Sequence, residues 1–299
     1  MTEGFRVGVV GAGAFATYHA GKVADHPRCI LSGIYDRSRD RAETLAGKHS
    51  VTASDSFDQL IEVSDALIVA IPSTEHTQSA LTSLDAGCHL LVEKPLAPSV
   101  QQAERIVAKA ASTGRVLQVG HQERIVMSAI GLDRVEARPS EIEIVRHGPR
   151  SRRNLDASVV MDLMVHDLDL LGALFGPPDW VSTEAARTVY SGKIDTARAE
   201  LGFGETTAYV SASRDAEPER RWTLRYPQGT VSIDFGRKTL RHDTPFDLDA
   251  DFGERADVKD SLATAFDRFV RACLDGHAPL ATGEEGLAAV RVAAAIEGT

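Results

Sequence analysis

The sequence lacks the residues that would build a disulfide framework, a membrane span or a nucleic-acid surface. Its three cysteines, Cys29, Cys88 and Cys273, are odd in number and have no metal-ligand spacing, so we expect neither disulfides nor a metal site. Apolar runs such as 66–72 fall far short of the ~18 residues of a membrane span, and the N-terminus lacks the apolar core of a secretory signal. Lys and Arg number 33 against 43 Asp and Glu, a formal charge of -10 that disfavours nucleic-acid and membrane partners. We therefore expect a cytoplasmic protein.

Residues 1–121 show the alternation of short apolar runs and helix-length segments that is typical of repeated βα units. Because parallel strands need a crossover helix between them, this alternation predicts a doubly wound parallel sheet of the Rossmann type, within an α/β protein. The predicted strands are 5–10, 30–36, 66–71, 89–93 and 116–120, and the predicted helices are 14–23, 39–48, 75–86 and 100–112.

Residues 122–299 have a different pattern, which predicts a second domain of α+β type. A strongly apolar helix at 159–175 precedes five candidate strands, at 180–190, 197–203, 206–213, 221–226 and 230–235. Helices follow at 261–274 and after a capping box at Thr282, and they could pack back on the first domain. We expect an open, mostly antiparallel sheet that binds substrate and, through its uncovered face, joins the chain into a homodimer or homotetramer.

A glycine-rich turn follows the first predicted strand. The segment Gly11-Ala12-Gly13-Ala14-Phe15-Ala16 has the G-x-G-x-x-A pattern, in which glycines let the backbone approach a pyrophosphate at a helix N-terminus. Asp36 ends the second strand, where an acid can bind the adenine ribose. This arrangement favours NAD over NADP, although the adjacent Arg37 could hold a 2′-phosphate. The alternative is a glycine turn that only packs a helix on a strand.

Two groups of polar residues are candidates for catalysis. Lys94 follows the fourth predicted strand, at the edge where open α/β sheets bind ligands, although a lone lysine is often only a solvated charge. Asp162, His166 and Asp169 are spaced to share one stripe of the apolar helix at 159–175. A solvent-facing stripe or a satisfied core histidine is the alternative to a catalytic site.

The motifs together resemble the Gfo/Idh/MocA oxidoreductases, which act on sugars and cyclitols with a nicotinamide cofactor. The resemblance runs from Val7 to about Ile296 and is carried by the glycine turn, Pro72 with His76, the segment 86–89 leading to Glu93-Lys94-Pro95-Leu96, and Asp162-x-x-x-His166-x-x-Asp169. It implies that Lys94 contacts the nicotinamide ribose and the reacting hydroxyl, that His166 is the general base and that Asp162 orients His166 or holds the sugar. We expect a cofactor site that comprises Gly11, Gly13, Ala14, Phe15, Asp36, Arg37, Pro72, Ser73, His76, Glu93 and Lys94.

The middle of the chain resembles more closely the branch of this family that includes UDP-N-acetylglucosamine 3-dehydrogenases. The segments 119–124, 146–149 and 159–169 carry this resemblance, and the three-glycine segment common before the Asp-x-x-x-His helix is absent, as in that branch. Ile125, Val126 and Met127 depart from the branch, which usually has an aromatic residue, Asn and Pro there.

Arginines cluster in the same region of this otherwise acidic chain. Between Glu143 and Asp156 there is no acidic residue, and arginine side chains suit a diphosphate. A solvated basic loop or an oligomer contact is the alternative interpretation. The predicted substrate site comprises Arg124, Arg146, Arg150, Arg153, Asp162 and His166, with Arg152 and His147 in the same basic cluster.

Three functions remain open at this point. The first is an NAD-dependent dehydrogenase of a sugar or nucleotide sugar, with C3 of UDP-N-acetylglucosamine as the expected position. The second is a dehydrogenase of a free sugar, a cyclitol or a sugar acid, for which the arginines would be incidental. The third, of another class, is an NAD-binding regulator without turnover, since a fold alone does not secure activity. A glycosidase that oxidises its substrate transiently with bound NAD would use the same residues.

Overall fold

The computed structural model describes residues 4–151 and 155–299 and divides them into two compact units. The first comprises the described residues up to His121 together with Leu262–Leu287, and the second comprises Gln122–Ser261 and Ala288–Thr299. The C-terminal segment that joins the first unit carries a long helix and the start of the last one. In the described part of the chain, no helix combines the length and the apolar character needed to cross a bilayer.

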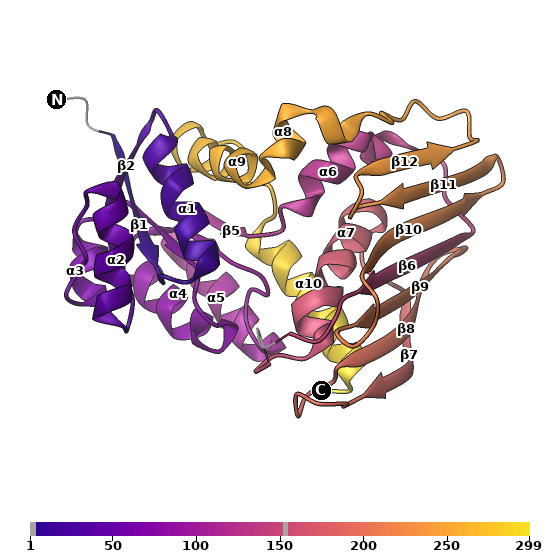
Figure 1. The fold of residues 1–299 in the computed structure, drawn as a ribbon, viewed down its shortest axis with the longest axis horizontal. Coiled ribbons are helices and arrows are strands. Elements are labelled where there is room, and N and C mark those ends of the chain that lie inside the picture. Colours follow the sequence, from indigo (N-terminus) through magenta and orange to yellow (C-terminus); the bar gives the residue numbers. More distant parts are fainter. Residues whose placement is uncertain (1–3, 152–154) are drawn as a thin grey trace. The chain divides into compact units, whose positions relative to one another are not determined.

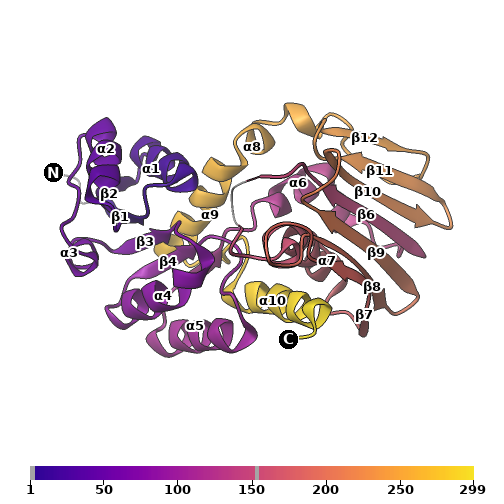
Figure 2. The ribbon, with the colours of Figure 1, turned by 60° about the horizontal axis from the view of Figure 1, so that its bottom comes forward.

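The first unit is built from a five-stranded parallel sheet with helices on both faces. Figure 2 shows α1 and α2 on one face and α4 and α5 on the other. Its strands are β1 (Phe5–Val10), β2 (Cys29–Tyr35), β3 (Ala66–Val69), β4 (His89–Val92) and β5 (Leu117–Val119). Its helices are α1 (Ala14–Asp25), α2 (Arg39–His49), α3 (Phe57–Glu62), α4 (His76–Asp85), α5 (Val100–Thr113) and α9 (Ser261–Asp275), with a 3₁₀ turn at Ser73–Glu75.

The strand order of this sheet, β2-β1-β3-β4-β5, brings five loops to one edge. Because all neighbouring pairs are parallel, every strand ends at that edge. From β1 the chain first adds β2 on one side of that strand and then crosses over to add β3 on the other side. The position between β1 and β3 is therefore a topological switch point, which is where open α/β sheets bind ligands. The glycine turn, Asp36 and Lys94 all follow strands of this sheet.

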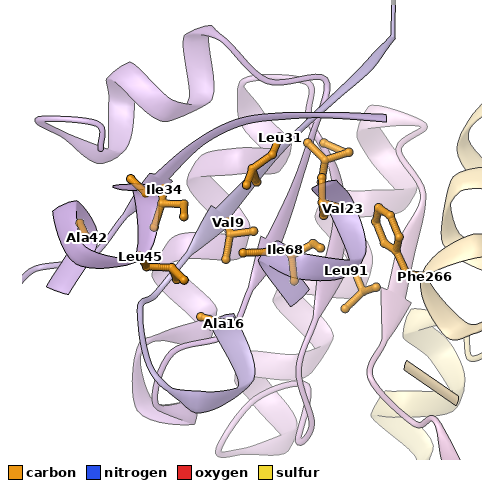
Figure 3. Packing of buried hydrophobic residues seen from close by; sticks show 14 of the residues in the cluster. Val9, Ala16, Val23, Leu31, Ile34, Ala42, Leu45, Ile68, Leu91 and Phe266 are labelled. Carbon is orange, nitrogen blue, oxygen red and sulfur yellow. The ribbon is translucent and has the colours of Figure 1, made fainter. Parts of the chain in front are cut away.

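Apolar packing fixes these strands relative to the helices on one face. Val9 and Ile68 of the sheet pack with Ala16 and Val23 of α1, and Leu45 of α2 joins the same cluster (Figure 3). Phe266 of α9, far along the sequence, lies in that cluster and is 1% exposed. The C-terminal segment therefore completes the core of the first unit.

The second unit is a seven-stranded sheet with helices on one face. Its strands are β6 (Glu141–His147), β7 (Trp180–Arg187), β8 (Thr196–Phe203), β9 (Thr206–Ser213), β10 (Glu219–Tyr226), β11 (Gly229–Asp234) and β12 (Thr239–His242). Its helical segments are α6 (Glu123–Ile130), 3₁₀ turns at Leu132–Arg134 and Phe252–Glu254, a π-helical segment at Val160–Met164, α7 (Val165–Phe175) and α8 (Ala256–Lys259); α10 (Gly283–Glu297) ends in this unit.

The order of the sheet, β12-β11-β10-β6-β9-β8-β7, contains one parallel pair, β6 with β9, among antiparallel ones. Figure 1 shows α6 and α7 on one face of this sheet and, among the described residues, no helix on the other. The uncovered face is mixed. Arg225 pairs with Glu141 at 2.7 Å and Arg221 lies 3.7 Å from Glu143, while the rings of Trp180 and Tyr209 are exposed on the same face.

Several elements are absent from the sequence-based prediction. It misses α3, α6, α8, β6 and β12, and it describes the π-helical segment as ordinary α-helix. Of these, β6 matters most because it is the central strand of the second sheet. The capping box predicted at Thr282 does form, with Glu285 N donating to Thr282 Oγ1 at 3.2 Å. The N-terminus of α5 is capped in a similar way, with Gln102 N donating to Ser99 Oγ at 3.4 Å.

Candidate active site

The glycine turn after β1 has a backbone that only glycine fits at its first position. Gly11 has φ +110°, and a Cβ added there would lie 2.4 Å from the carbonyl oxygen of Ala70. The amide of Gly11 donates to the carbonyl of Tyr35 at 2.7 Å. Because the turn is held between the ends of β2 and β3, its position at the switch point is fixed by the sheet.

The second glycine leaves open space at the start of α1. Gly13 is the N-cap of α1 without a side-chain cap, and a Cβ there would meet nothing within 4 Å. Ala14 begins the helix, and Phe15 beside it is 52% exposed, its ring 6.3 Å from that of Tyr18. An uncapped N-terminus with space in front of it fits the pyrophosphate of a dinucleotide.

Asp36 connects the end of β2 to the glycine turn. Its Oδ2 accepts the amide of Ala12 at 2.8 Å, while its Oδ1 accepts Ser38 N and Arg41, each at 2.8 Å. A carboxylate has about four acceptor sites, so Oδ2 keeps capacity for a ribose hydroxyl. Arg37 instead forms an ion pair with Glu75, in which the guanidinium nitrogen and the carboxylate oxygen are 2.6 Å apart.

The loop after β3 carries Pro72, which is exposed, and Ser73, which is half-buried. His76 follows but is 1% exposed, with Nδ1 2.9 Å from the carbonyl of Pro95 and Nε2 3.0 Å from that of Ile71. Burial lowers the pKa of His76. The structure corrects the expectation that His76 contacts the cofactor: its ring instead joins the loops after β3 and β4.

Glu93 and Lys94 follow β4, and their side chains have different surroundings. The Glu93 carboxylate, 7% exposed as a residue, lies 2.7 Å from Nε2 of His19 and accepts the amide of Lys94 at 3.3 Å. Burial opposes its charge, but the hydrogen bond with His19 and the charges of His19 and Lys94 lower the pKa of Glu93. The carboxylate of Glu93 thus has partners within the protein, and its contact with the cofactor stays a prediction. Lys94 is half-buried at the edge of the sheet.

The predicted helix of the second unit carries Asp162 and His166. Asp162 lies in the π-helical segment, where Val165 N donates to the carbonyl of Val160, five residues back. Such segments often occur at functional sites. The Asp162 carboxylate lies 3.8 Å from Arg214, which follows β9, and Nδ1 of His166 lies 3.7 Å from Oε1 of Glu123. The polar stripe thus has charged partners.

Arg146, predicted to bind substrate phosphate, is instead at the centre of a buried network. It donates to Asp167 at 2.6 and 2.9 Å and to Glu123 at 3.1 and 2.6 Å, and it is 6% exposed. Trp222 also donates to Asp167, at 2.8 Å. Because the guanidinium is occupied by two carboxylates, it cannot also clamp a diphosphate, and we correct that expectation.

The other predicted substrate arginines differ in their positions. Arg124 is bound by Asp169 at 2.8 and 2.6 Å in a buried bidentate pair, so it too is a structural residue. Arg150 is exposed, donates to Asp215 at 2.7 and 3.0 Å and stacks over Tyr190 at 5.1 Å. Arg152 and Arg153 lie outside the described residues.

Glu123 and His19 contact the candidate site residues but were not predicted from the sequence. Glu123 stands directly before Arg124, and His19 lies three residues after the glycine turn. Neither has a local signal, because each acts through a partner distant in sequence. In the described part of the chain, no group of three or more His, Cys, Asp and Glu is arranged to hold a metal ion.

The first unit has the fold and the loop chemistry of a dinucleotide-binding domain, joined to a mixed sheet that carries an Asp-x-x-x-His helix. Comparison with known proteins agrees: residues 5–121 match the model of an oxidoreductase family with an NAD-binding Rossmann fold. Residues 133–232 match the model of the GFO/IDH/MocA C-terminal domain. The chain belongs to the Gfo/Idh/MocA family of oxidoreductases, and its N-terminal unit is an NAD-binding Rossmann domain.

Individual relatives match either nearly the whole chain or a part of it. A UDP-N-acetylglucosamine 3-dehydrogenase of Acidithiobacillus ferrooxidans is 32% identical over 97% of this chain and 94% of its own. A solved structure of that dehydrogenase has a TM-score of 0.89 over 98% of this chain and 96% of its own, with 31% identity. An inositol 2-dehydrogenase of Cereibacter sphaeroides is 31% identical over 56% of this chain and 52% of its own.

Proposed function

We propose that this protein is an NAD-dependent dehydrogenase that oxidises the C3 hydroxyl of UDP-N-acetylglucosamine. The observation that carries the proposal is the full-length similarity to a dehydrogenase of that name, together with an Asp162–His166 pair whose surroundings in the structure are charged and partly buried. The family has many substrates, so the nucleotide sugar is the finer part of the proposal.

The residues after β1 and β2 fit NAD. When bound, the nicotinamide ring would accept a hydride from the carbinol carbon. The N-terminus of α1 would hold the pyrophosphate and Asp36 the adenine ribose, whose 2′-phosphate in NADP the carboxylate would repel. Arg37 is engaged by Glu75 at 2.6 Å, which also supports NAD over NADP.

In the proposed reaction, Lys94 and His166 assist the loss of the hydroxyl proton. His166 accepts this proton as general base, and the ammonium of Lys94 stabilises the developing negative charge on the same oxygen. Asp162 orients the sugar or the imidazole. The hydride and the proton thus leave the alcohol in one oxidation, which turns a secondary hydroxyl into a ketone.

A second candidate is the oxidation of an uncharged cyclitol or sugar. It is favoured by the finding that Arg146 and Arg124 are each occupied by buried carboxylates, which removes two of the predicted phosphate ligands. The similarity to an inositol 2-dehydrogenase is consistent with this candidate. Of the predicted substrate arginines that the structure describes, Arg150 is the exposed one.

Substrate screening tests the proposal. We expect UDP-N-acetylglucosamine to reduce NAD and to yield a 3-keto product, while UDP-glucose, free N-acetylglucosamine and myo-inositol react at most weakly. Reduction of NAD by myo-inositol or a free sugar alone would support the second candidate. Tight NAD binding without reduction by any member of the panel would indicate a regulator and would contradict both proposals.

We also propose that the chain forms a homo-oligomer through the outer face of the seven-stranded sheet. This face combines ion pairs, such as Arg225 with Glu141 at 2.7 Å, with the exposed rings of Trp180 and Tyr209, which a partner copy could cover. Light scattering during gel filtration measures the mass of the particle. A monomer would contradict this proposal without bearing on the reaction.

A further inference from the structure

Glu123 lies against the proposed base but is not part of the predicted site. It is the first residue of α6, and its Oε1 lies 3.7 Å from Nδ1 of His166. The two side chains are 18% and 20% exposed, so water screens their interaction only weakly. At this separation the carboxylate acts on the ring mainly through its charge.

Two arginines hold the carboxylate of Glu123 in place. Arg146 of β6 donates to both of its oxygens, at 3.1 and 2.6 Å, and Arg220 of β10 donates to Oε1. A carboxylate fixed from two strands cannot rotate away from His166. Its position relative to the imidazole is therefore set by the sheet.

The charges around His166 come from four elements of the second unit. Glu123 of α6 and Asp167 of α7 are negative, whereas Arg146 of β6 and Arg220 of β10 are positive. Asp162, one turn earlier on the helix of His166, lies 3.8 Å from Arg214. The four charges of the network therefore cancel, and removal of Glu123 alone would leave a positive excess beside the imidazole.

We propose that Glu123 is a positioning residue for His166: it faces Nδ1, which leaves Nε2 for the substrate, and it compensates the charge of the imidazolium. This inference rests on the proposed function, in which His166 is the general base. In the reaction, the proton of the substrate hydroxyl moves to Nε2, and the hydride moves to the nicotinamide. The imidazolium formed in this way is stabilised by the carboxylate of Glu123.

Histidine NMR tests the charge relationship without substrate. In protein labelled with 15N-histidine, with the His166 signal assigned through His166→Asn, we expect Glu123→Gln to move the titration of His166 to lower pH by about one unit. Arg220→Gln should move it to higher pH, and the double variant should return it towards the wild-type position. Glu141→Gln, which removes an exposed carboxylate paired with Arg225 at 2.7 Å, is the matched control and should not move it.

These variants separate charge compensation from simple support of the fold. If Glu123 only stabilised the structure, the double variant would be the most perturbed, whereas charge balance predicts that it is the least perturbed of the three. Should Glu123→Gln fail to fold, Glu123→Asp and Arg220→Gln still test the proposal. An unchanged His166 titration in the folded Arg220→Gln and Glu123→Gln proteins would overturn it.

Kinetics provide the second readout. With UDP-N-acetylglucosamine, we expect Glu123→Gln to lower kcat at least about tenfold, to shift the acid limb of the kcat profile to lower pH, and to leave the KM for NAD unchanged. Glu123→Asp should restore the position of the limb. If the wild-type enzyme does not oxidise this sugar, the proposed function fails, while the histidine titration still decides the role of Glu123.

Discussion

The carboxylate of Asp36 accepts a hydrogen bond, 2.8 Å long, from the backbone amide of Ala12. The acid that ends the second strand is thus tied to the glycine turn that ends the first. Because β1 and β2 are neighbours in a parallel sheet, the two loops share one edge, and their mutual orientation is set before any ligand binds. If Asp36 binds the adenine ribose as proposed, this half of the cofactor site is preorganised.

Replacement of Asp36 by Ala should weaken NAD binding more than NADP binding. The variant loses the acceptor for the ribose hydroxyls, worth about 1.5–3 kcal/mol for a charged group, so the Kd for NAD should rise about tenfold to a hundredfold. It also loses the charge that repels a 2′-phosphate, so the ratio of the Kd for NADP to the Kd for NAD should fall. Fluorescence titration measures both constants. Asp40→Asn, on the exposed first turn of α2, is the control, and an equal Kd for NAD in Asp36→Ala would contradict the assignment.

The two glycines of the turn should respond differently to alanine. Gly11→Ala places a methyl group 2.4 Å from the carbonyl oxygen of Ala70 at a φ of +110°, so we expect a loss of stability of about 1–3 kcal/mol. Gly13→Ala meets open space and should change stability by less than about 1 kcal/mol, yet it should impair NAD binding because its methyl group points to the pyrophosphate site. Thermal unfolding and NAD titration of both variants test this contrast. Normal NAD binding by Gly13→Ala would rule out that path for the pyrophosphate.

Glu93→Gln should lower stability at neutral pH but not in acid. The pKa of Glu93 is lowered in the folded protein, so its carboxylate contributes stability above the unfolded pKa of about 4.3, and this contribution is lost as the pH falls through the folded value. We expect the free energy of unfolding of wild type to exceed that of Glu93→Gln by about 1–3 kcal/mol near pH 7, and the difference to shrink as the pH falls below the unfolded pKa of Glu93. Urea unfolding at several pH values measures this difference in the free energy of unfolding. Glu62→Gln, at an exposed position, is the control. A difference that is constant with pH would show that the charge of Glu93 is not the cause.

Arg146→Ala and Arg150→Ala should separate a structural arginine from an exposed one. Arg146→Ala leaves the carboxylates of Glu123 and Asp167 buried without their shared cation, a loss of about 3–5 kcal/mol. Arg150→Ala removes an exposed ion pair with Asp215, so the free energy of unfolding should stay close to that of wild type. Denaturant unfolding compares the two. If Arg146→Ala were as stable as wild type, the buried network would not be what holds α6 and α7 to the sheet.

The first unit could be predicted almost strand by strand from the sequence. Each βα repeat carries its own local signals, such as the capping box at Ser99 and the Gly114 that ends α5 in the left-handed conformation. Five of the six helices and all five strands of this unit were predicted near their observed ends for this reason. The short helix α3, capped by Ser56, was missed because one and a half turns carry too little periodicity.

The second unit shows where a linear pattern misleads. Arg146 and His147 are adjacent in sequence and were predicted to belong to one basic cluster. In β6, however, successive side chains point to opposite faces, so Arg146 is buried against Asp167 while His147 faces Ser211 on the outer side, 2.8 Å away. Polar and apolar residues alternate from Glu141 to Ile144, which is the local signal for this strand. The basic residues that follow were interpreted as a phosphate-binding cluster instead.

Partners distant in sequence account for the other omissions. The pairing of Glu123 with His166 depends on how α6 and α7 lie on the sheet, and nothing within either helix encodes it. The π-helical segment at Asp162 likewise depends on one backbone hydrogen bond, from Val165 to Val160, which apolar periodicity does not reveal. The candidate catalytic residues Lys94, Asp162 and His166 could therefore be proposed from the sequence, whereas the residues that contact them could not.

Transfer of a labelled hydride tests the central claim most directly. The protein is incubated with NAD and UDP-N-acetylglucosamine that carries deuterium at C3, and the reduced cofactor is analysed by mass spectrometry. The account predicts deuterated NADH with the wild-type protein and almost none with folded Lys94→Ala or His166→Ala. Unlabelled NADH, or wild-type turnover by both folded variants, would contradict it.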